Sequence, residues 1–417
     1  MRLSLNIQIL IGALAGVALG LLFNGLGAEA EITKNGIYLS ALVGNTFIDL
    51  LKMVLVPLVF ASIAVGVANL RLHQQMHRVW ISTLAFFVLS MAIAIVLGLA
   101  SVNLFEPGKG LSLDLFKDAM HGFTAKQMTL PEFVVHFFHG LFINPFAALA
   151  QGDVLAIVIF ALFIGIALVM GGDRYRNILV LLQEGLEITL RIVGWIMRLA
   201  PLGIMALLAQ LVANQNLELL ASLAKFVVVV LATTFLHGAI VLPLLLFIVT
   251  RLSPLHFFKG AREALITAFA TSSSSATLPV TLRCVEQHLH VKPEIAGFVV
   301  PLGATVNMDG TALYEASAAL FIANLAGIDL NLIQQFIVFF TAMLAAIGAP
   351  GIPSAGMVTM VMVLQSVGLP AEAIAILLPI DRLLDAFRTM VNVEGDMIGS
   401  LIVQKLVKSG TSKGGVR

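Results

Sequence analysis

Long apolar stretches are the feature that most limits what this chain can fold into. Several exceed the roughly 20 residues that a helix needs to cross a hydrocarbon core of about 30 Å. Only 11% of the residues are charged, whereas a soluble domain carries roughly 25%. A closed β-barrel would instead show short segments of alternating hydrophobicity. The sequence therefore predicts an all-α polytopic membrane protein, with apolar segments at about 6–24, 38–70, 79–105, 134–170, 177–213 and 217–250.

The chain after residue 250 divides into two interrupted and two continuous apolar stretches. We interpret 293–324 and 371–406 as continuous, and 255–285 and 331–365 as broken by serine, glycine and proline. Lys and Arg mark cytoplasmic loops; they flank 255–285 on both sides and 331–365 on neither. If every stretch were a full span, basic loops would not occur on one side of the membrane only. If the two broken stretches are re-entrant hairpins, these basic loops fall on the cytoplasmic side. The prediction is eight transmembrane helices plus two re-entrant helical hairpins, multi-pass in the cell membrane, with both termini cytoplasmic.

The two broken stretches carry unusual tips. The first reads TSSSSATLPVT, with Ser272 to Ser275, and the second reads AAIGAPGIPSAG. Non-helical backbone at membrane depth survives only where protein buries it or where it lines a cavity. Two hairpins that enter from opposite sides, each followed by a polar helix, indicate an inverted repeat with a ligand site at the midplane. The alternative for the serines is a polar face for helix packing.

The stretch 371–406 concentrates charge in an apolar setting. On a wheel of 100° per residue, its polar positions share an arc of about 80°, namely Asp381, Asp385, Arg388, Asn392 and Asp396. A charge at the bilayer centre costs roughly 2.5–3.5 kcal/mol, so this arc faces protein, water or ligand. The alternative is an internal ion pair between Asp385 and Arg388. Glu394 falls outside the arc, and we expect it near water at the helix end.

The charges of the polar helices suggest which ligands they bind. The two polar helices contain more carboxylates than guanidiniums. The five carboxylates are Asp309, Glu315, Asp381, Asp385 and Asp396, and the two guanidiniums are Arg382 and Arg388. The surplus carboxylates, with amide and carbonyl oxygens, suit a hard monovalent cation such as Na⁺. Arg388 offers a planar fork for a carboxylate, and Asp385 could accept an ammonium group. The net charge of +1 suggests no nucleic-acid partner.

The ordered motifs TSSSSATLPVT, NMDGTALYE, GAPGIPSAG and DAFRTMVNVEGD resemble those of the dicarboxylate/amino acid:cation symporter family, which includes excitatory amino acid transporters. The resemblance implies a homotrimer in the lipid bilayer and an elevator mechanism. It also implies a scaffold of helices 1, 2, 4 and 5 and a moving transport domain. The corresponding segments are 1–78 and 133–213 for the scaffold, 106–132 for an extracellular loop, and 79–105 and 214–417 for the transport domain.

The resemblance also implies a substrate site for an acidic amino acid. The side-chain carboxylate would meet Arg388 and Thr311, the amino group Asp385, and the main carboxylate Asn392 and the serine tip. The full implied set is Ser273, Ser274, Thr311, Ile352, Gly356, Asp385, Arg388, Thr389 and Asn392. Neutral amino acid and C4-dicarboxylate carriers of the same fold are the alternatives.

Sodium ligands follow from the same resemblance. One site would use carbonyls of Gly303, Asn307 and Asn392 with the Asp396 carboxylate. A second would use carbonyls of Thr305, Ala346, Ile347 and Ala349. A third, beside Asp309 and Asn307, normally has a Tyr and two hydroxyl residues on the third helix, where this chain has Phe87, Ser90 and Met91.

Two further positions depart from parts of the family. The usual second arginine is replaced by Ser272 or Ala386, and Arg382 lies one turn away from Ala386. Glu315 matches an acidic residue that some members use for proton coupling; here it is either a proton carrier or a neutral, hydrogen-bonded carboxyl. We therefore expect coupling to Na⁺ and partly to protons, and no organic cofactor.

Two other classes of membrane protein, an intramembrane hydrolase and an uncoupled ion channel, are alternatives to a symporter. An intramembrane hydrolase would need Asp309 and Asp385 as a dyad, or a tip serine as nucleophile. No GxSG-like elbow surrounds the serines and the polar helices contain no histidine, so we expect no enzyme. An uncoupled ion channel would differ by showing no saturable solute flux.

Overall fold

A computed structural model describes residues 5–27, 30–69, 77–110, 139, 142–151, 154–214, 217–349, 351 and 353–411. Within these ranges every regular element is a helix, in agreement with the predicted all-α class. Of the predicted loop 106–132, only residues 106–110 fall within the described ranges.

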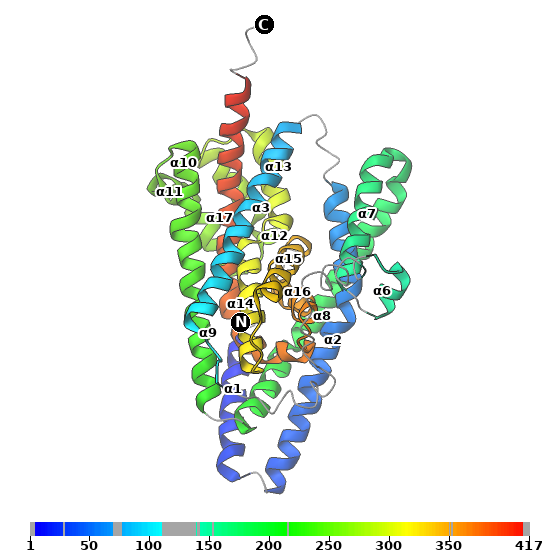
Figure 1. The fold of residues 1–417 in the computed structure, drawn as a ribbon, viewed down its shortest axis with the longest axis vertical. Coiled ribbons are helices and arrows are strands. Elements are labelled where there is room, and N and C mark those ends of the chain that lie inside the picture. The colour runs from blue at the N-terminus through cyan, green and yellow to red at the C-terminus, as the bar shows by residue number, and fades with distance from the viewer. Residues whose placement is uncertain are drawn as a thin grey trace.

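One set of helices occupies the lower and right-hand parts of Figure 1. It contains α1 (Leu5–Leu26), α2 (Glu31–Asn69), α6 (Pro145–Gln151), α7 (Val154–Gly171), the 3-10 turn η3 (Gly172–Tyr175) and α8 (Arg176–Asn214). Helix α8 packs along both α1 and α2, and α2 packs along α7. The segments 159–196 and 198–210 meet at a bend of 48°. Pro201 lies beside this bend, and proline removes a helical hydrogen bond.

A second set of helices surrounds the long C-terminal helix. It contains α3 (His77–Phe105), α9 (Leu217–Leu236), the π-turn η4 (His237–Val241), α10 (Leu242–Thr250), the 3-10 turn η6 (Ala371–Ala373) and α17 (Ile374–Thr411). Helices α3, α9 and α10 all pack against α17. The division of the chain into a scaffold and a moving transport domain stays a prediction.

The first broken stretch folds back on itself. Helix α11 (Pro254–Thr271) and helix α12 (Ser274–Arg283), which continues into the π-turn η5 (Cys284–His288), are separated by Ser272 and Ser273. Arg283 Nη2 lies 2.6 Å from Glu263 Oε2, so residues on either side of the turn come together as in a hairpin. The helix is interrupted at Ser272 and Ser273, as the hairpin prediction requires, whereas its entry into a membrane stays a prediction.

The second broken stretch has the same form, and the two tips touch. Helix α15 (Leu332–Gly348) and helix α16 (Ala355–Ser366) pair through the Thr341 and Ser366 hydroxyls, 3.1 Å apart. The Gly351 carbonyl accepts hydrogen bonds from Ser273 Oγ at 2.7 Å and from the Ser275 N–H at 3.0 Å. Two breaks that are 78 residues apart along the chain therefore form one contact.

The prediction of a continuous helix over 293–324 is wrong. The structure has α13 (Pro293–Val306) and α14 (Asp309–Leu325), separated by Asn307 and Met308. The backbone at Asn307 is extended, with φ −97° and ψ 90°. The Asn307 side chain donates to Asp396 Oδ1 at 3.1 Å, so the break brings Asn307 to α17.

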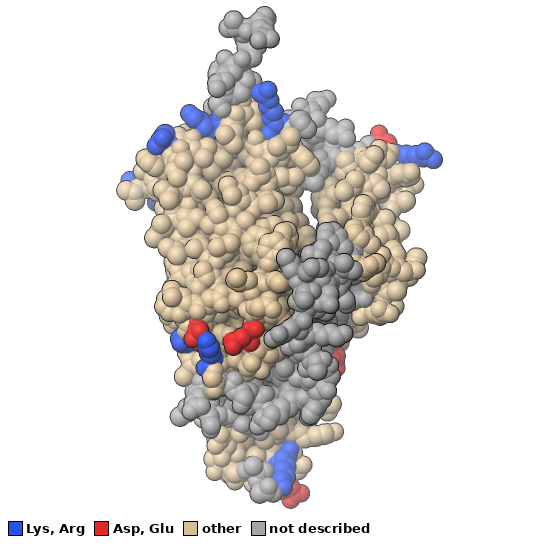
Figure 2. Space-filling view, viewed as in Figure 1, with Lys and Arg blue, Asp and Glu red and all other residues tan. Residues whose placement is uncertain are grey.

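The outer surface agrees with a membrane protein. Figure 2 shows a broad uncharged face, with Lys and Arg gathered near the end of α17. Among the described residues, three helices are long and apolar enough to cross a bilayer, at Ile7–Leu26, Arg78–Phe105 and Ala221–Thr250, or up to four with the bent pair. Several other predicted spans are broken or rich in charge, so the count of eight stays a prediction.

The contact between α3 and α14 provides a stability test. A Cβ on Gly98 would lie 2.7 Å from the Leu313 carbonyl oxygen, whereas a Cβ on Gly297 would meet nothing within 4 Å. We expect Gly98→Ala to lower the free energy of unfolding by roughly 1–3 kcal/mol through overpacking. Gly297→Ala should leave it unchanged or slightly raised. Thermal unfolding in detergent measures both, and equal midpoints would contradict this packing.

Candidate functional site

The polar arc of α17 lies inside the protein, as the wheel predicted. Arg388 is only 1% exposed, and Asp381, Asp385, Asn392 and Asp396 are also buried. Elements α9, η4, α11, α13 and α14 pack around this helix. The arc therefore faces protein on all sides, and its charges depend on one another and on these neighbours.

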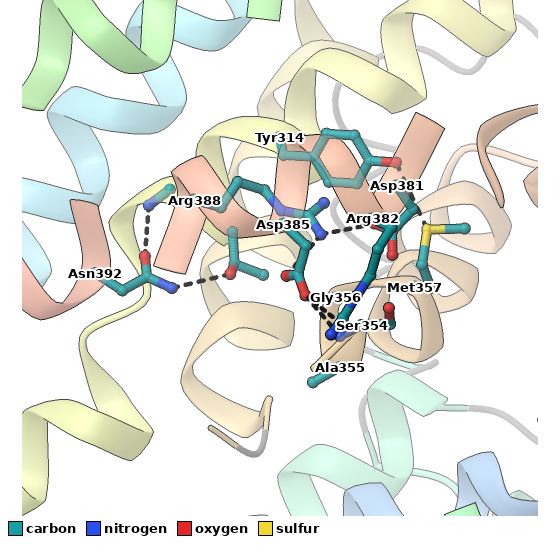
Figure 3. A network of polar contacts seen from close by, with 12 residues as sticks. Tyr314, Ser354, Ala355, Gly356, Met357, Asp381, Arg382, Asp385, Arg388 and Asn392 are labelled. Atoms are coloured by element: carbon teal, nitrogen blue, oxygen red, sulfur yellow. Dashed lines mark hydrogen bonds and ion pairs between the residues drawn. The ribbon is translucent and has the colours of Figure 1, made fainter. Parts of the chain in front are cut away.

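Arg388 is the centre of the first cluster (Figure 3). Its Nη2 donates to Asp381 Oδ1 at 2.6 Å and to Asp385 Oδ1 at 2.9 Å. The internal ion pair that we considered as an alternative is thus present, with Asp381 as an additional partner. Arg388 Nε and Nη1, both buried, have no hydrogen-bond partner among the described residues. Pairing with carboxylates consequently leaves part of the guanidinium available.

Asp385 connects this cluster to the tip of the second hairpin. Its Oδ2 accepts from the Ser354 N–H at 2.8 Å and lies 3.5 Å from Arg382 Nη1. Ser354 has a left-handed backbone, φ 58°, which is uncommon for a residue with a side chain. The carboxylate that we predicted to accept an ammonium group therefore also holds the hairpin tip.

Asn392 joins the start of α14 to α17. Its Oδ1 accepts from the Gly310 N–H at 2.8 Å, and its Nδ2 donates to Thr311 Oγ1 at 3.2 Å. Gly356 of α16 lies opposite: a Cβ there would be 3.0 Å from Thr311 Cγ2 and 3.9 Å from Arg388 Nη1. Glycine at 356 thus allows α16 to approach Thr311 closely, beside Nη1 of Arg388.

The remaining predicted substrate residues are less directly connected. Ser273 caps α12 by accepting from the Ala276 N–H at 3.1 Å, and Ser274 is buried at the first position of that helix. Thr389 is buried on α17. Ile352 lies outside the described residues. In the part of the chain that the structure describes, the tip serines bond to Gly351 and to their own hairpin rather than to Arg388 or Asn392.

A second cluster surrounds Asp309. Its Oδ1 accepts from Ser90 Oγ at 3.1 Å, and its Oδ2 lies 3.0 Å from His237 Nε2. Ser90 Oγ also lies 3.4 Å from Asn307 Oδ1. Three of the residues predicted for the third-helix cation site are thus together, and Phe87 and Met91 add only apolar surface. His237 is an unpredicted member, since 72 residues separate it from Asp309.

Asp396 lies close to the other predicted sodium ligands. Asn307 donates to its Oδ1, and a Cβ on Gly303 would lie 2.2 Å from the same oxygen. For the second predicted site, α13, which carries Thr305, packs against α15, which carries Ala346 and Ile347 and is followed by Ala349. Carboxylate, amide and carbonyl oxygens suit hard cations. No group of three His, Cys, Asp or Glu side chains forms a metal cluster within the described ranges.

Two buried glutamates complete the site. Thr359 Oγ1 donates to Glu315 Oε1, and Glu315 Oε2 has no partner within the described residues. Glu394 is 2% exposed, so our expectation that it lies near water is wrong. Helix α17 continues to Thr411, which places Glu394 in the middle of the helix. A Cβ on Gly238 of η4 would lie 3.1 Å from Glu394 Oε2.

The two acids of the proposed hydrolase dyad have different surroundings. Asp309 bonds to Ser90 and His237, whereas Asp385 bonds to Arg388, Arg382 and Ser354. Within the described ranges they share no partner, which does not suit a proton-sharing pair. The arrangement instead provides one buried cationic edge and several oxygen-rich clusters, the chemistry of ligand and cation binding.

Sequence reasoning left several members of these clusters without a role. Asp381 was on the predicted arc, and its spacing of seven residues from Arg388 was an available signal. Ser354 and His237 come from other elements, and so does Tyr314, whose ring lies 4.0 Å from Arg388 Cζ; nothing in their local sequence indicates which side chain they meet. Their assignment required the tertiary structure.

Comparisons with known proteins agree with the motifs. A model of the sodium:dicarboxylate symporter family matches residues 5–406. Excitatory amino acid transporter 3 of Mus musculus is 34% identical, covering 97% of this chain and 86% of that protein. Excitatory amino acid transporter 2 of Rattus norvegicus is 36% identical over 94% of this chain and 78% of that protein. Neutral amino acid transporter B(0) of Oryctolagus cuniculus is 33% identical, over 97% and 80%. The resemblance is thereby confirmed, and the chain belongs to the sodium:dicarboxylate symporter family.

Proposed function

We propose that this protein is a secondary active symporter that imports an acidic amino acid, L-aspartate or L-glutamate, together with Na⁺ and protons. One observation carries the proposal: Arg388 is 1% exposed, yet its Nε and Nη1 have no partner among the described residues. Buried donors without partners are costly, and an anionic ligand group would satisfy them. A carrier of neutral amino acids would have no ligand carboxylate in the side chain to pair with a buried guanidinium.

The neighbours of Arg388 give the proposed position of the substrate. The side-chain carboxylate would bind Arg388 and Thr311, next to Gly356 of α16. The amino group would bind Asp385, in competition with its present bonds to Arg388 and the Ser354 N–H. The main carboxylate would bind Asn392 and the first-hairpin tip at Ser273 and Ser274, with Thr389 and Ile352 completing the pocket. Binding would thus release the second hairpin tip from Asp385.

Sodium would be carried at the oxygen-rich clusters. We assign one ion to Asp396 with carbonyls of Gly303, Asn307 and Asn392, and another to carbonyls of Thr305, Ala346, Ile347 and Ala349. The Asp309 and Ser90 cluster is a weaker candidate, because both carboxylate oxygens of Asp309 already have partners. Protons would be carried at Glu315, whose Oε2 is buried without a partner among the described residues.

Alternating access would follow an elevator movement in a homotrimer within the cell membrane. The second helix set, taken together with both hairpins, α13 and α14, contains both clusters. It meets the first set along α2, α7 and α8. A rigid movement of the second set against the first would carry substrate and ions together.

Uptake into proteoliposomes tests the function. L-aspartate, L-glutamate, succinate and L-serine are each offered under a Na⁺ gradient or a proton gradient alone. Saturable, gradient-driven uptake of the two acidic amino acids is expected. Preference for succinate would support a C4-dicarboxylate carrier, preference for serine a neutral amino acid carrier, and unsaturable flux a channel.

Replacing the guanidinium should change the preferred substrate. Arg388→Cys removes the cation that binds the side-chain carboxylate, and a charge-assisted hydrogen bond contributes roughly 1.5–3 kcal/mol. We expect aspartate affinity to fall by at least about ten-fold, with neutral amino acids admitted. Unchanged aspartate uptake would rule out the assignment. Asp329→Asn, an exposed position, is the control.

Asp396 should determine the Na⁺ requirement. Asp396→Asn keeps the size of the side chain but removes its charge, so we expect the Na⁺ concentration for half-maximal uptake to rise by about ten-fold or more. The substrate affinity at saturating Na⁺ should change far less. An unchanged Na⁺ dependence in a correctly folded variant would exclude Asp396 as a ligand.

Glu315 should determine the response to a proton gradient. Wild-type uptake of labelled aspartate should rise with an inward proton gradient, whereas Glu315→Gln, which cannot exchange a proton, should not respond. Thr359→Ser keeps the donor to Glu315 and serves as the matched control. If wild type and Glu315→Gln alike ignore the gradient, the coupling role is wrong and Glu315 is a structural carboxyl.

A further inference from the structure

Tyr314 covers one face of the Arg388 guanidinium. The Arg388 Cζ lies 4.0 Å from the centroid of the Tyr314 ring, and Figure 3 shows the ring lying against the guanidinium. Both side chains are almost completely buried. A guanidinium over an aromatic face within about 6 Å makes a cation–π contact, which is stronger where water is excluded.

The ring of Tyr314 is itself held in place from behind. Phe226 of α9 lies against it, with ring centroids 6.4 Å apart and planes inclined by 47°. Phe226 in turn stacks on Phe321 of α14, at 4.3 Å and 13°. All three aromatic side chains are fully buried. The Tyr314 hydroxyl lies 3.5 Å from Met357 Sδ of α16, so packing and this contact fix the plane of the ring.

Arg388 is therefore restrained on two sides. Asp381 and Asp385 hold Nη2, and Tyr314 holds one face. The donors Nε and Nη1 remain without partners in the described part of the chain, and Nη1 is the one nearest to Gly356. An arginine side chain has many rotamers, and restricting them before binding reduces the entropy lost on binding.

We infer that Tyr314 is a positioning residue that sets the preference for acidic over uncharged ligands. Its ring, backed by Phe226, holds the guanidinium with Nε and Nη1 directed at the place of the ligand's side-chain carboxylate. Tyr314 acts through Arg388 and touches no ligand. The inference rests on the proposed function, in which Arg388 binds that carboxylate. A ligand with an uncharged side chain gains much less from the orientation of Arg388.

The experiment compares L-aspartate with its uncharged, nearly isosteric analogue L-asparagine. The readout is the inhibition constant of L-asparagine divided by the KM of L-aspartate in proteoliposomes. Tyr314→Leu removes the ring, and we expect this ratio to fall by about ten-fold. Tyr314→Phe keeps the ring, so its ratio should stay within about two-fold of the wild-type ratio, even if its overall transport rate changes. An equal loss of affinity for both ligands would mean a structural role and would overturn the inference.

The Arg388→Cys background shows whether Tyr314 acts through the guanidinium. Adding Tyr314→Leu to Arg388→Cys should leave the ratio as it is in Arg388→Cys alone, because no guanidinium remains to be positioned. A further fall of similar size in this background would overturn the inference. If Tyr314→Leu does not fold, Phe226→Leu replaces it, with a smaller fall expected in the same direction. An unchanged ratio in folded Phe226→Leu would then be the contradicting result.

A ligand-free measurement separates this inference from the proposed function. Thermal unfolding of wild type, Tyr314→Leu, Arg388→Cys and the double variant forms a double-mutant cycle. We expect the double variant to lose less than the sum of the two single losses in unfolding midpoint. Additive losses would refute the contact even if aspartate is transported. Absence of aspartate uptake by wild type would refute the proposed function and leave this coupling still measurable.

Discussion

A buried guanidinium imposes the main constraint on this structure. A charge removed from water is costly unless it is paired and hydrogen-bonded, and Arg388 is only 1% exposed. Two carboxylates of its own helix, Asp381 and Asp385, supply the pairing. The ring of Tyr314 supplies a polarisable surface on one face. Side chains from α9, α14 and α16 reach this group or its partners.

The helix breaks follow from the same constraint. Backbone groups released from a helix inside a membrane protein need partners. The Ser354 N–H donates to Asp385, and the Gly351 carbonyl accepts from Ser273 Oγ. At the third break, the Asn307 side chain donates to Asp396. Two of the breaks thus meet the polar arc, and the first hairpin tip meets the second.

The arc also explains how one helix can couple different ligands. Going along α17, the Asp385 and Arg388 cluster is followed one turn later by Asn392, and one turn after that by Asp396. Asn392 bonds to Gly310 and Thr311 at the start of α14, directly after the break whose Asn307 reaches Asp396. In the proposed mechanism, a cation at Asp396 and a substrate at Arg388 would both act on the conformation of the same short segment, 307–311. Binding of one ligand would therefore change the affinity for the other.

Hydropathy, glycine and proline placement and helical periodicity are local properties, so the helical class, the two hairpin breaks and the polar arc could be predicted from them. The sequence also identified the family through ordered motifs. Its errors have a physical reason: the break at Asn307 and the burial of Glu394 depend on contacts with η4, α3 and α17, which no local pattern contains. Only the tertiary structure could decide that His237 meets Asp309, that Ser354 binds Asp385, and that Tyr314 covers Arg388. These pairs join side chains from different elements, and their meeting is set by how the helices pack.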